Sequence, residues 1–341
     1  MNFQQFLSWR EQQLETQPDL VDGGETNLYR ALASLSMPAP EAVERRIYRC
    51  DLARAWLSRY GYAETLSRQA LVCRGVRHAL SLIFRDLKAH DGVLWLPGDV
   101  YPVYQELAQA AGITPSVYAS LPAPTLPSAA AISGEEVLLL ANPWKPLGRY
   151  LNGNETAALL QWLQASPRRH VIIDTVYDLD APFHASTRAL QQTGRAILLH
   201  SITKGWLAPR PFGVALVGEQ HARLEGVFRD EPPSQEQLRL AERALSTAAD
   251  KPGVVAQALQ TRARRLLSLL PPGIEAALTL EPSQLAPGCY FFAVDLPAQT
   301  LLREHRWLAI PASAFGARDW RGSIITSLAP VFAAPDQESA A

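Results

Sequence analysis

The stretch LLHSITKGWLAPRPFG, residues Leu198 to Gly213, places a single lysine, Lys204, where an apolar run ends. Two hydroxyl side chains, Ser201 and Thr203, come just before it, and a turn rich in glycine and proline carries Arg210 after it. A solvated loop lysine is the commoner explanation for any one such residue. The other explanation is a lysine that binds a carbonyl compound covalently as an imine. The residues in the rest of the chain discriminate between these two explanations.

Composition limits the classes of protein that need to be considered. The chain has 341 residues, of which 48% are apolar and 19% charged, so we expect an ordinary soluble protein of about two domains. A net charge of −1 gives no overall field that would attract nucleic acid or anionic lipid. Apolar runs stay well short of the ~20 residues needed to cross a bilayer. The sequence therefore predicts a cytoplasmic protein with neither a nucleic-acid nor a membrane partner.

Cysteine and histidine usage argues against a structural metal or a disulfide framework. The three cysteines, Cys50, Cys73 and Cys289, are scattered along the chain. The seven histidines show no ligand-like spacing. We therefore expect no protein-bound metal ion.

Short apolar runs alternate with helical patterns from residue 51 onward. The runs are continuous in Val, Ile and Leu and do not alternate with polar residues, which indicates strands buried on both faces. Helical patterns lie between them, for example at 76–87, 103–112 and 155–165. This order predicts an α/β fold with a mostly parallel sheet sandwiched by helices. The runs are ALVC (70–73), VLWL (93–96), EVLLLA (136–141), HVIID (170–174), AILLHS (196–201) and VALVG (214–218).

Changes in pattern divide the chain into four parts. Residues 1–50 are expected to form an N-terminal arm, and residues 51–230 the large domain. Residues 231–330 are expected to form a smaller C-terminal α+β domain that includes the interdomain helices, because short strands follow Pro271 and Pro272. The polar end, 331–341, is expected to be disordered.

Chemically distinctive residues follow the predicted strands, and ligands of open α/β sheets bind at the carboxyl ends of strands. The first run leads into Gly75, Val76 and Arg77 at the start of a helix, where free N–H groups could bind an anion such as phosphate. Tyr101 follows the second run, where its ring could stack on a planar ligand or simply pack. The alternative for the glycine turn is an ordinary loop.

The next two runs end in polar residues as well. The run 136–141 is followed by Asn142 and a turn that contains Lys145. The run 170–174 ends at Asp174, and Tyr177 follows three residues later. Burying a carboxylate is costly unless it is paired, so we expect a cationic partner for Asp174.

Taken in order, these segments resemble the class I/II branch of the fold-type I aminotransferases, which use pyridoxal 5'-phosphate. NPWKPLG resembles that family's Asn-Pro-x-Asn-Pro-Thr-Gly turn, and DTVYD resembles its Asp-Glu-x-Tyr. SITKGWLAPRPFG is similar to its Ser-x-Ser-Lys segment with the following Arg-x-Gly. APGCYFFAVDL and IPASAFG are similar to a strand and a turn of its small domain. The similarity runs from Asp51 to Ala329.

The resemblance implies a role for each central residue. Lys204 would hold the cofactor as an imine and later carry a substrate proton. Asp174 would pair with the pyridine nitrogen, Tyr177 would donate a hydrogen bond to the phenolic oxygen, and Tyr101 would stack over the ring. Asn142 and Lys145 of the turn would also contact the cofactor.

The resemblance also implies a phosphate site and a subunit arrangement. Ser201, Thr203, Arg210 and the backbone around Gly75, Val76 and Arg77 would hold the phosphate. Tyr48 resembles a tyrosine that reaches the phosphate from the neighbouring subunit, which would make the enzyme a homodimer. The alternative is that Tyr48 only packs within its own chain.

The chain departs from the family pattern at positions that would contact the cofactor or the substrate. Lys145 replaces an asparagine that touches the phenolic oxygen, and it would either favour the phenolate or point to solvent. Ile325 stands where the family has the arginine that binds the substrate carboxylate. Either Arg318 or Arg321 substitutes for it, or the substrate is not an ordinary α-amino acid. If the pocket is otherwise standard, Ile325→Arg is expected to improve or preserve activity toward simple amino acids.

The resulting hypothesis is a pyridoxal-phosphate enzyme that acts on an amine or a modified amino acid. Transamination is the leading reaction, and decarboxylation, elimination and cyclisation remain alternatives. A third hypothesis is a cofactor-binding regulator. It is less favoured because the arm lacks a basic helix-turn-helix pattern.

Overall fold

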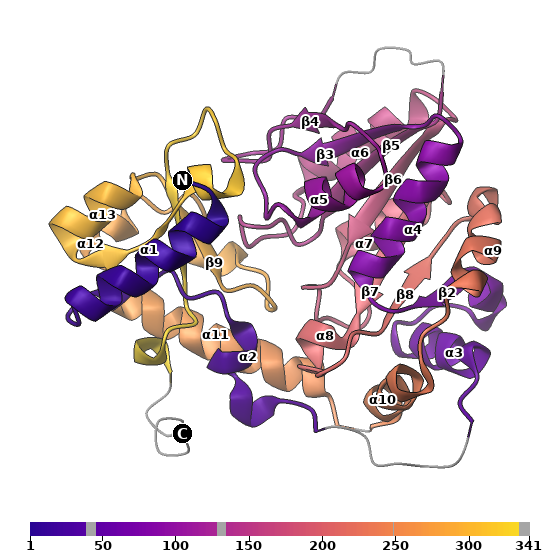
Figure 1. Cartoon of the computed structure of the whole chain (residues 1–341), viewed down its shortest axis with the longest axis horizontal. Helices are drawn as coiled ribbons and strands as arrows, with labels where there is room; N and C mark the ends of the chain where they lie inside the picture. Colours follow the sequence, from indigo (N-terminus) through magenta and orange to yellow (C-terminus); the bar gives the residue numbers. More distant parts are fainter. Residues whose placement is uncertain (39–45, 128–133, 248, 334–341) are drawn as a thin grey trace.

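The computed structural model describes residues 1–38, 46–127, 134–247 and 249–333. A large sheet with helices on both sides forms one body, and a smaller sheet with its own helices forms the other (Figure 1). The long helix α11 (Lys251–Leu269) and the N-terminal helix α1 (Phe3–Thr16) lie with the smaller body.

The large sheet has seven strands in the order β2-β8-β7-β6-β5-β3-β4. The pairings from β7 through β4 are parallel, and β8 runs antiparallel to both β2 and β7. The mostly parallel sheet predicted from the apolar runs is therefore confirmed, whereas β4 was not predicted. The strands are β2 (Ala70–Cys73), β3 (Val93–Pro97), β4 (Ser116–Tyr118), β5 (Glu136–Ala141), β6 (Arg169–Asp174), β7 (Ala196–Ser201) and β8 (Gly213–Leu216).

Helices cover both faces of the large sheet, which explains why its strands are apolar throughout. Successive strand residues point to opposite faces. Leu139 of β5 packs in the cluster that contains α4 and α5, and Leu138 packs in the cluster that contains α6. The helices around the sheet are α3 (Arg49–Arg59), α4 (Val76–Ala89), α5 (Val103–Ala110), α6 (Gly153–Gln164), α7 (Ala185–Gln191), α9 (Arg223–Asp230) and α10 (Gln235–Ser246).

The smaller body has a three-stranded antiparallel sheet in the order β11-β12-β9. Side chains from α11, α13 and the strands share one apolar cluster. Helix α10 packs on α3 and joins the cluster beneath β2 and β8, so it lies with the large sheet. The elements are β9 (Phe291–Val294), β11 (Ile310–Pro311), β12 (Ser323–Thr326), α12 (Pro272–Glu275) and α13 (Ala298–His305).

The N-terminal arm is built into the smaller body. Strand β1 (Val21–Asp22) pairs in parallel with β10 (Trp307–Leu308), and Thr326 donates its N–H to the carbonyl of Gly23 at 2.8 Å. Arg10 of α1 forms ion pairs with Asp22 and with Glu25, the latter at 3.0 Å. These contacts fix the path of the arm before it reaches α2 (Leu28–Ala31).

The segment 331–341, expected to be disordered, lies outside the described residues from 334 onward. Within the described ranges, no helix combines the length and apolar character needed to cross a bilayer.

The turn after β5 is held firmly in place. The Asn142 side chain donates to the Ser186 and Thr187 hydroxyls at 2.9 and 2.8 Å, and it accepts the N–H of Leu151 at 3.0 Å. Gly148 has a φ of +80°, and a Cβ there would stand 2.5 Å from the carbonyl oxygen of Phe291. Glycine is therefore required at this point, both by the backbone conformation and by the close approach of β9.

We expect Gly148→Ala to lower the free energy of unfolding by about 2 kcal/mol or more, because a left-handed residue and a backbone clash are combined. Urea titration followed by circular dichroism measures this change. Gly153→Ala is the matched control, since a Cβ at this first residue of α6 meets nothing within 4 Å. Equal stability of the two variants would contradict the close approach.

Candidate active site

The site lies at the carboxyl edge of the large sheet. Strand β6 ends at Asp174 and strand β7 ends at Ser201, and the short helix α8 (Ile202–Gly205) carries Lys204. Because β5, β6 and β7 are parallel neighbours, the residues that follow them meet at one edge.

Asp174 is buried, and its carboxylate has three partners. Tyr104 donates its hydroxyl to Oδ2 at 2.5 Å, and the N–H of Val176 donates to Oδ1 at 3.0 Å. The Lys145 ammonium lies 3.4 Å from Oδ2. The expected cationic partner of Asp174 is therefore Lys145. Tyr104 was missed from the sequence, although it follows Tyr101 by one helical turn.

Lys204 is surrounded by aromatic rings and by charge. Its Nζ lies 5.2 Å from the ring centroid of Tyr29 and 5.6 Å from that of Tyr177. Tyr29 donates its hydroxyl to the carbonyl of Thr203 at 2.9 Å. Burial and the nearby charges of Lys145 and Arg77 together lower the pKa of Lys204 to about 8, against the opposing effect of Asp174. Lys204 therefore loses its proton at a lower pH than an ordinary lysine does.

Lys145 does not point to solvent. Its side chain is 18% exposed, and its Nζ lies 4.4 Å from the ring centroid of Tyr177. The Tyr177 hydroxyl is hydrogen-bonded to that of Tyr290 at 2.9 Å, which ties the site to the strand β9 region. The alternative in which Lys145 points to solvent is therefore excluded.

A cradle for an anion lies at the start of α4. Gly75 precedes the helix with a φ of +102°, and no side chain caps the helix. A Cβ on Gly213 would stand 3.0 Å from the Gly75 Cα, so this turn lies directly against the helix start. The Ser201 hydroxyl lies 3.1 Å from that of Thr203 and donates to the Phe212 carbonyl at 2.8 Å. Uncapped N–H groups, including those of Val76 and Arg77, suit a phosphate.

Two other predicted cofactor ligands point elsewhere. Tyr101 is 39% exposed, and its ring meets that of Phe3 edge to face at a centroid distance of 5.1 Å. The Arg210 side chain is exposed and forms an ion pair with Glu236 at 3.1 Å. Their contacts with a ring and with a phosphate stay predictions.

The remaining predicted residues lie on the surface of the single chain. Tyr48 is 56% exposed at the start of α3. Arg318 and Arg321 are exposed in the loop before β12. Among the described residues, none of these three is hydrogen-bonded or ion-paired to Lys204 or Asp174. The roles of Tyr48, Arg318 and Arg321 stay predictions.

Ile325 is fully buried in the smaller body. It pairs with Phe292 across the β12–β9 ladder and belongs to the apolar cluster that also contains Trp307. A Cβ on Gly23 would stand 3.3 Å from its Cγ2, so the arm covers it as well. An arginine at this position would enter an apolar cluster, and this changes the outcome expected from the sequence for Ile325→Arg.

Because an unpaired buried charge is costly, we expect Ile325→Arg to lower the free energy of unfolding by about 3 kcal/mol or more. It should not confer activity toward simple amino acids. Ile325→Val, which removes one methyl group, should cost only about 0.5–1.5 kcal/mol. Urea unfolding of the two variants checks this, and an Ile325→Arg protein as stable as Ile325→Val would contradict it.

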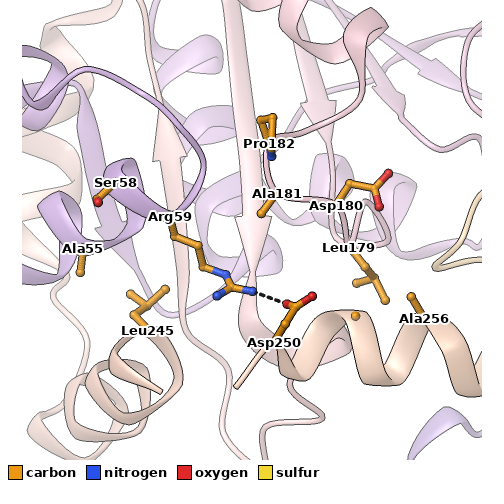
Figure 2. Close-up of a pocket in the computed structure, with 11 residues that line it drawn as sticks. Ala55, Ser58, Arg59, Leu179, Asp180, Ala181, Pro182, Leu245, Asp250 and Ala256 are labelled. Carbon is orange, nitrogen blue, oxygen red and sulfur yellow. Dashed lines mark hydrogen bonds and ion pairs between the residues drawn. The ribbon is translucent and has the colours of Figure 1, made fainter. Parts of the chain in front are cut away.

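Figure 2 shows a cavity of about 950 Å³. It lies between the end of α3, the loop 179–182 and the start of α11, and the Arg59–Asp250 ion pair of 2.8 Å crosses it. Neither Lys204 nor Asp174 lines it. The site is therefore defined by the chemistry at the strand ends and not by this cavity.

Comparison with known proteins shows the fold. No family model and no curated protein sequence matches the chain. L,L-diaminopimelate aminotransferase from Chlamydomonas reinhardtii superposes with a TM-score of 0.70 at 15% identity, over 96% of this chain and 91% of the other. A probable N-succinyldiaminopimelate aminotransferase from Thermus thermophilus gives 0.68 at 22% identity, over 96% of each chain.

A third similar structure is named as a decarboxylase and not as an aminotransferase. L-threonine-O-3-phosphate decarboxylase from Porphyromonas gingivalis gives a TM-score of 0.60 at 17% identity, over 94% of each chain. The chain thus has the fold of the aminotransferases to which its motifs were compared. The fold expected from the sequence resemblance is confirmed.

Proposed function

We propose that this chain is a pyridoxal-phosphate-dependent enzyme that acts on the amino group of an amine or a modified amino acid, and that it is most simply an aminotransferase. One observation supports the proposal above the others. A low-pKa lysine, a buried carboxylate and an uncapped helix start meet at one edge of a sheet with this fold. Each of the three matches one part of the cofactor: an aldehyde, a ring nitrogen and a phosphate.

The residues at the edge would divide the work of holding the cofactor. The N–H groups of Val76 and Arg77 would bind the phosphate together with the hydroxyls of Ser201 and Thr203. Asp174 would accept a hydrogen bond from the ring nitrogen, since its carboxylate is buried and already oriented by Tyr104.

Lys204 would carry the chemistry. The bound cofactor supplies an aldehyde that takes up amines and a ring that stabilises negative charge on a neighbouring carbon. Lys204 would hold the aldehyde covalently, release it to a substrate amine and then move a proton to or from the substrate carbon. Tyr29 and Tyr177 would exclude water from its amine, because their rings lie against it.

A decarboxylase, lyase or cyclase is the second candidate. The observation that favours it is the buried Ile325, which removes the carboxylate-binding arginine implied by the resemblance. A carboxylate held without that fork-shaped partner loses charge-assisted hydrogen bonds of about 1.5–3 kcal/mol each. Common α-amino acids should then be poor amino donors.

The proposal is tested by loading the purified chain with pyridoxal 5'-phosphate and recording its absorbance. The wild-type protein should show an absorbance band that the free cofactor lacks, since attachment to a lysine changes the conjugation of the ring. Lys204→Ala should lose this band, and Lys251→Ala, a change outside the site, should keep it. A Lys204→Ala protein with the wild-type band would contradict the assignment.

We also propose a homodimer in which Tyr48 reaches the partner's cofactor phosphate. Its support is the position of Tyr48, which is exposed at the start of α3 and, among the described residues, is not hydrogen-bonded to Lys204 or Asp174. Sedimentation should give twice the chain mass of 37.5 kDa, and Tyr48→Ala should weaken cofactor binding about tenfold without changing the circular dichroism spectrum. A monomer that binds the cofactor fully would refute the arrangement.

A further inference from the structure

Two of the four lysines in this chain share one site. Lysine occurs only at 88, 145, 204 and 251, and arginine supplies the other basic side chains. Lys145 and Lys204 approach the same aromatic ring, at 4.4 and 5.6 Å from the Tyr177 centroid. Two of the few lysines in an arginine-rich chain are therefore close together.

One carboxylate serves these two amines. Asp174 forms an ion pair with Lys145 at 3.4 Å and also acts on Lys204, but it forms no ion pair with Lys204 among the described residues. The carboxylate therefore stabilises the positive charge of Lys145 more than that of Lys204. Lys204 keeps a buried position next to a cation, where its own charge is unfavourable.

The other groups that face Lys204 do not reverse this balance. Arg77 of α4 adds a second positive charge. The rings of Tyr177, from the loop after β6, and Tyr29, from α2, can attract a cation, although their attraction is weaker than that of a carboxylate in contact. Among the described residues, Asp174 is the negative group that favours the charged form of Lys204, and it is already ion-paired with Lys145.

We propose that Lys145 is a positioning residue that disfavours the charged form of Lys204 and so increases the fraction of its amine that is uncharged and nucleophilic. The inference rests on the proposed function in taking Lys204 as the reactive lysine. A cation beside a buried lysine is a known means of activating the amine. The turn that carries Lys145 is fixed by the Asn142 hydrogen bonds and by Gly148, and its ammonium contacts the Asp174 carboxylate and the Tyr177 ring.

Lys145 disfavours the charged form of Lys204 in two ways, because its own charge repels that of Lys204 and because its ion pair partly neutralises Asp174. Removing the Lys145 charge frees Asp174 to stabilise a charged Lys204, so both effects raise the pKa of Lys204. A purely structural lysine would leave the protonation of Lys204 unchanged. Arginine at 145 keeps the charge and should therefore preserve the effect.

The experiment measures the protonation of Lys204 in the cofactor-free full-length chain. Formaldehyde with cyanoborohydride is applied briefly at pH 6 to 10, and peptide mass analysis gives the extent of labelling at Lys204. Only the uncharged amine reacts, so the midpoint of the pH profile reports its pKa. The exposed Lys88 serves as the internal reference. The wild-type midpoint at Lys204 should lie near pH 8.

In Lys145→Met, we expect this midpoint to rise by about one pH unit, and in Lys145→Arg it should stay near the wild-type value. Lys145→Gln is the second neutral variant in case the methionine protein does not fold, as judged by circular dichroism. Lys251→Met is the matched control and should change nothing. An unchanged midpoint in the neutral variants, or an equal rise in Lys145→Arg, would overturn the proposal.

This readout is separate from the proposed function. If the wild-type chain fails to take up pyridoxal 5'-phosphate but the midpoint still rises in Lys145→Met, the function is wrong and the inference holds. If the cofactor binds through Lys204 and the midpoint does not move, the inference fails alone.

Discussion

A carboxylate buried at the end of β6 is the constraint around which the site is arranged. Taking an ionised Asp174 out of water costs several kcal/mol unless it is paired and hydrogen-bonded. Hydrogen bonds to a charged group contribute about 1.5–3 kcal/mol each, so Tyr104, the Val176 N–H and Lys145 together can offset that cost. Because these partners come from α5, the strand end and the turn after β5, the carboxylate fixes three elements relative to one another.

The N-terminal arm closes the site from the other body. Tyr29 donates to the Thr203 carbonyl beside Lys204, and Arg262 of α11 donates to the Ala31 carbonyl at 2.7 Å. The same arm is paired through β1 with β10. A displacement of the smaller body would therefore move a ring that lies against the Lys204 amine. This connection gives the arm a direct part in excluding water from Lys204.

Much of this arrangement could be predicted from the sequence. The apolar runs gave six of the seven strands of the large sheet, and the rule that ligands bind at strand ends selected Asp174, Lys204 and Gly75. These inferences succeed because burial on both faces and chain position at a strand end are local properties. They need no knowledge of which distant segments meet.

Most of the misses depend on long-range contacts. Tyr29 lies 175 positions before Lys204, and nothing in its local pattern shows that the arm returns to the large sheet. Ile325 aligns with the substrate-binding arginine of the family, but its local sequence does not show that its side chain packs into the smaller body. The pairing of Lys145 with Asp174 also depends on how a turn folds back. Such features become visible only when side-chain directions are fixed by packing.

The most direct test of this account is chemical trapping of the cofactor on its lysine. The chain is loaded with pyridoxal 5'-phosphate, reduced with borohydride and digested, and the pyridoxyl group is located by mass analysis among the four lysines. The account predicts that the label is on Lys204. A label on Lys145, the other amine in the same site, or no label at all would contradict it.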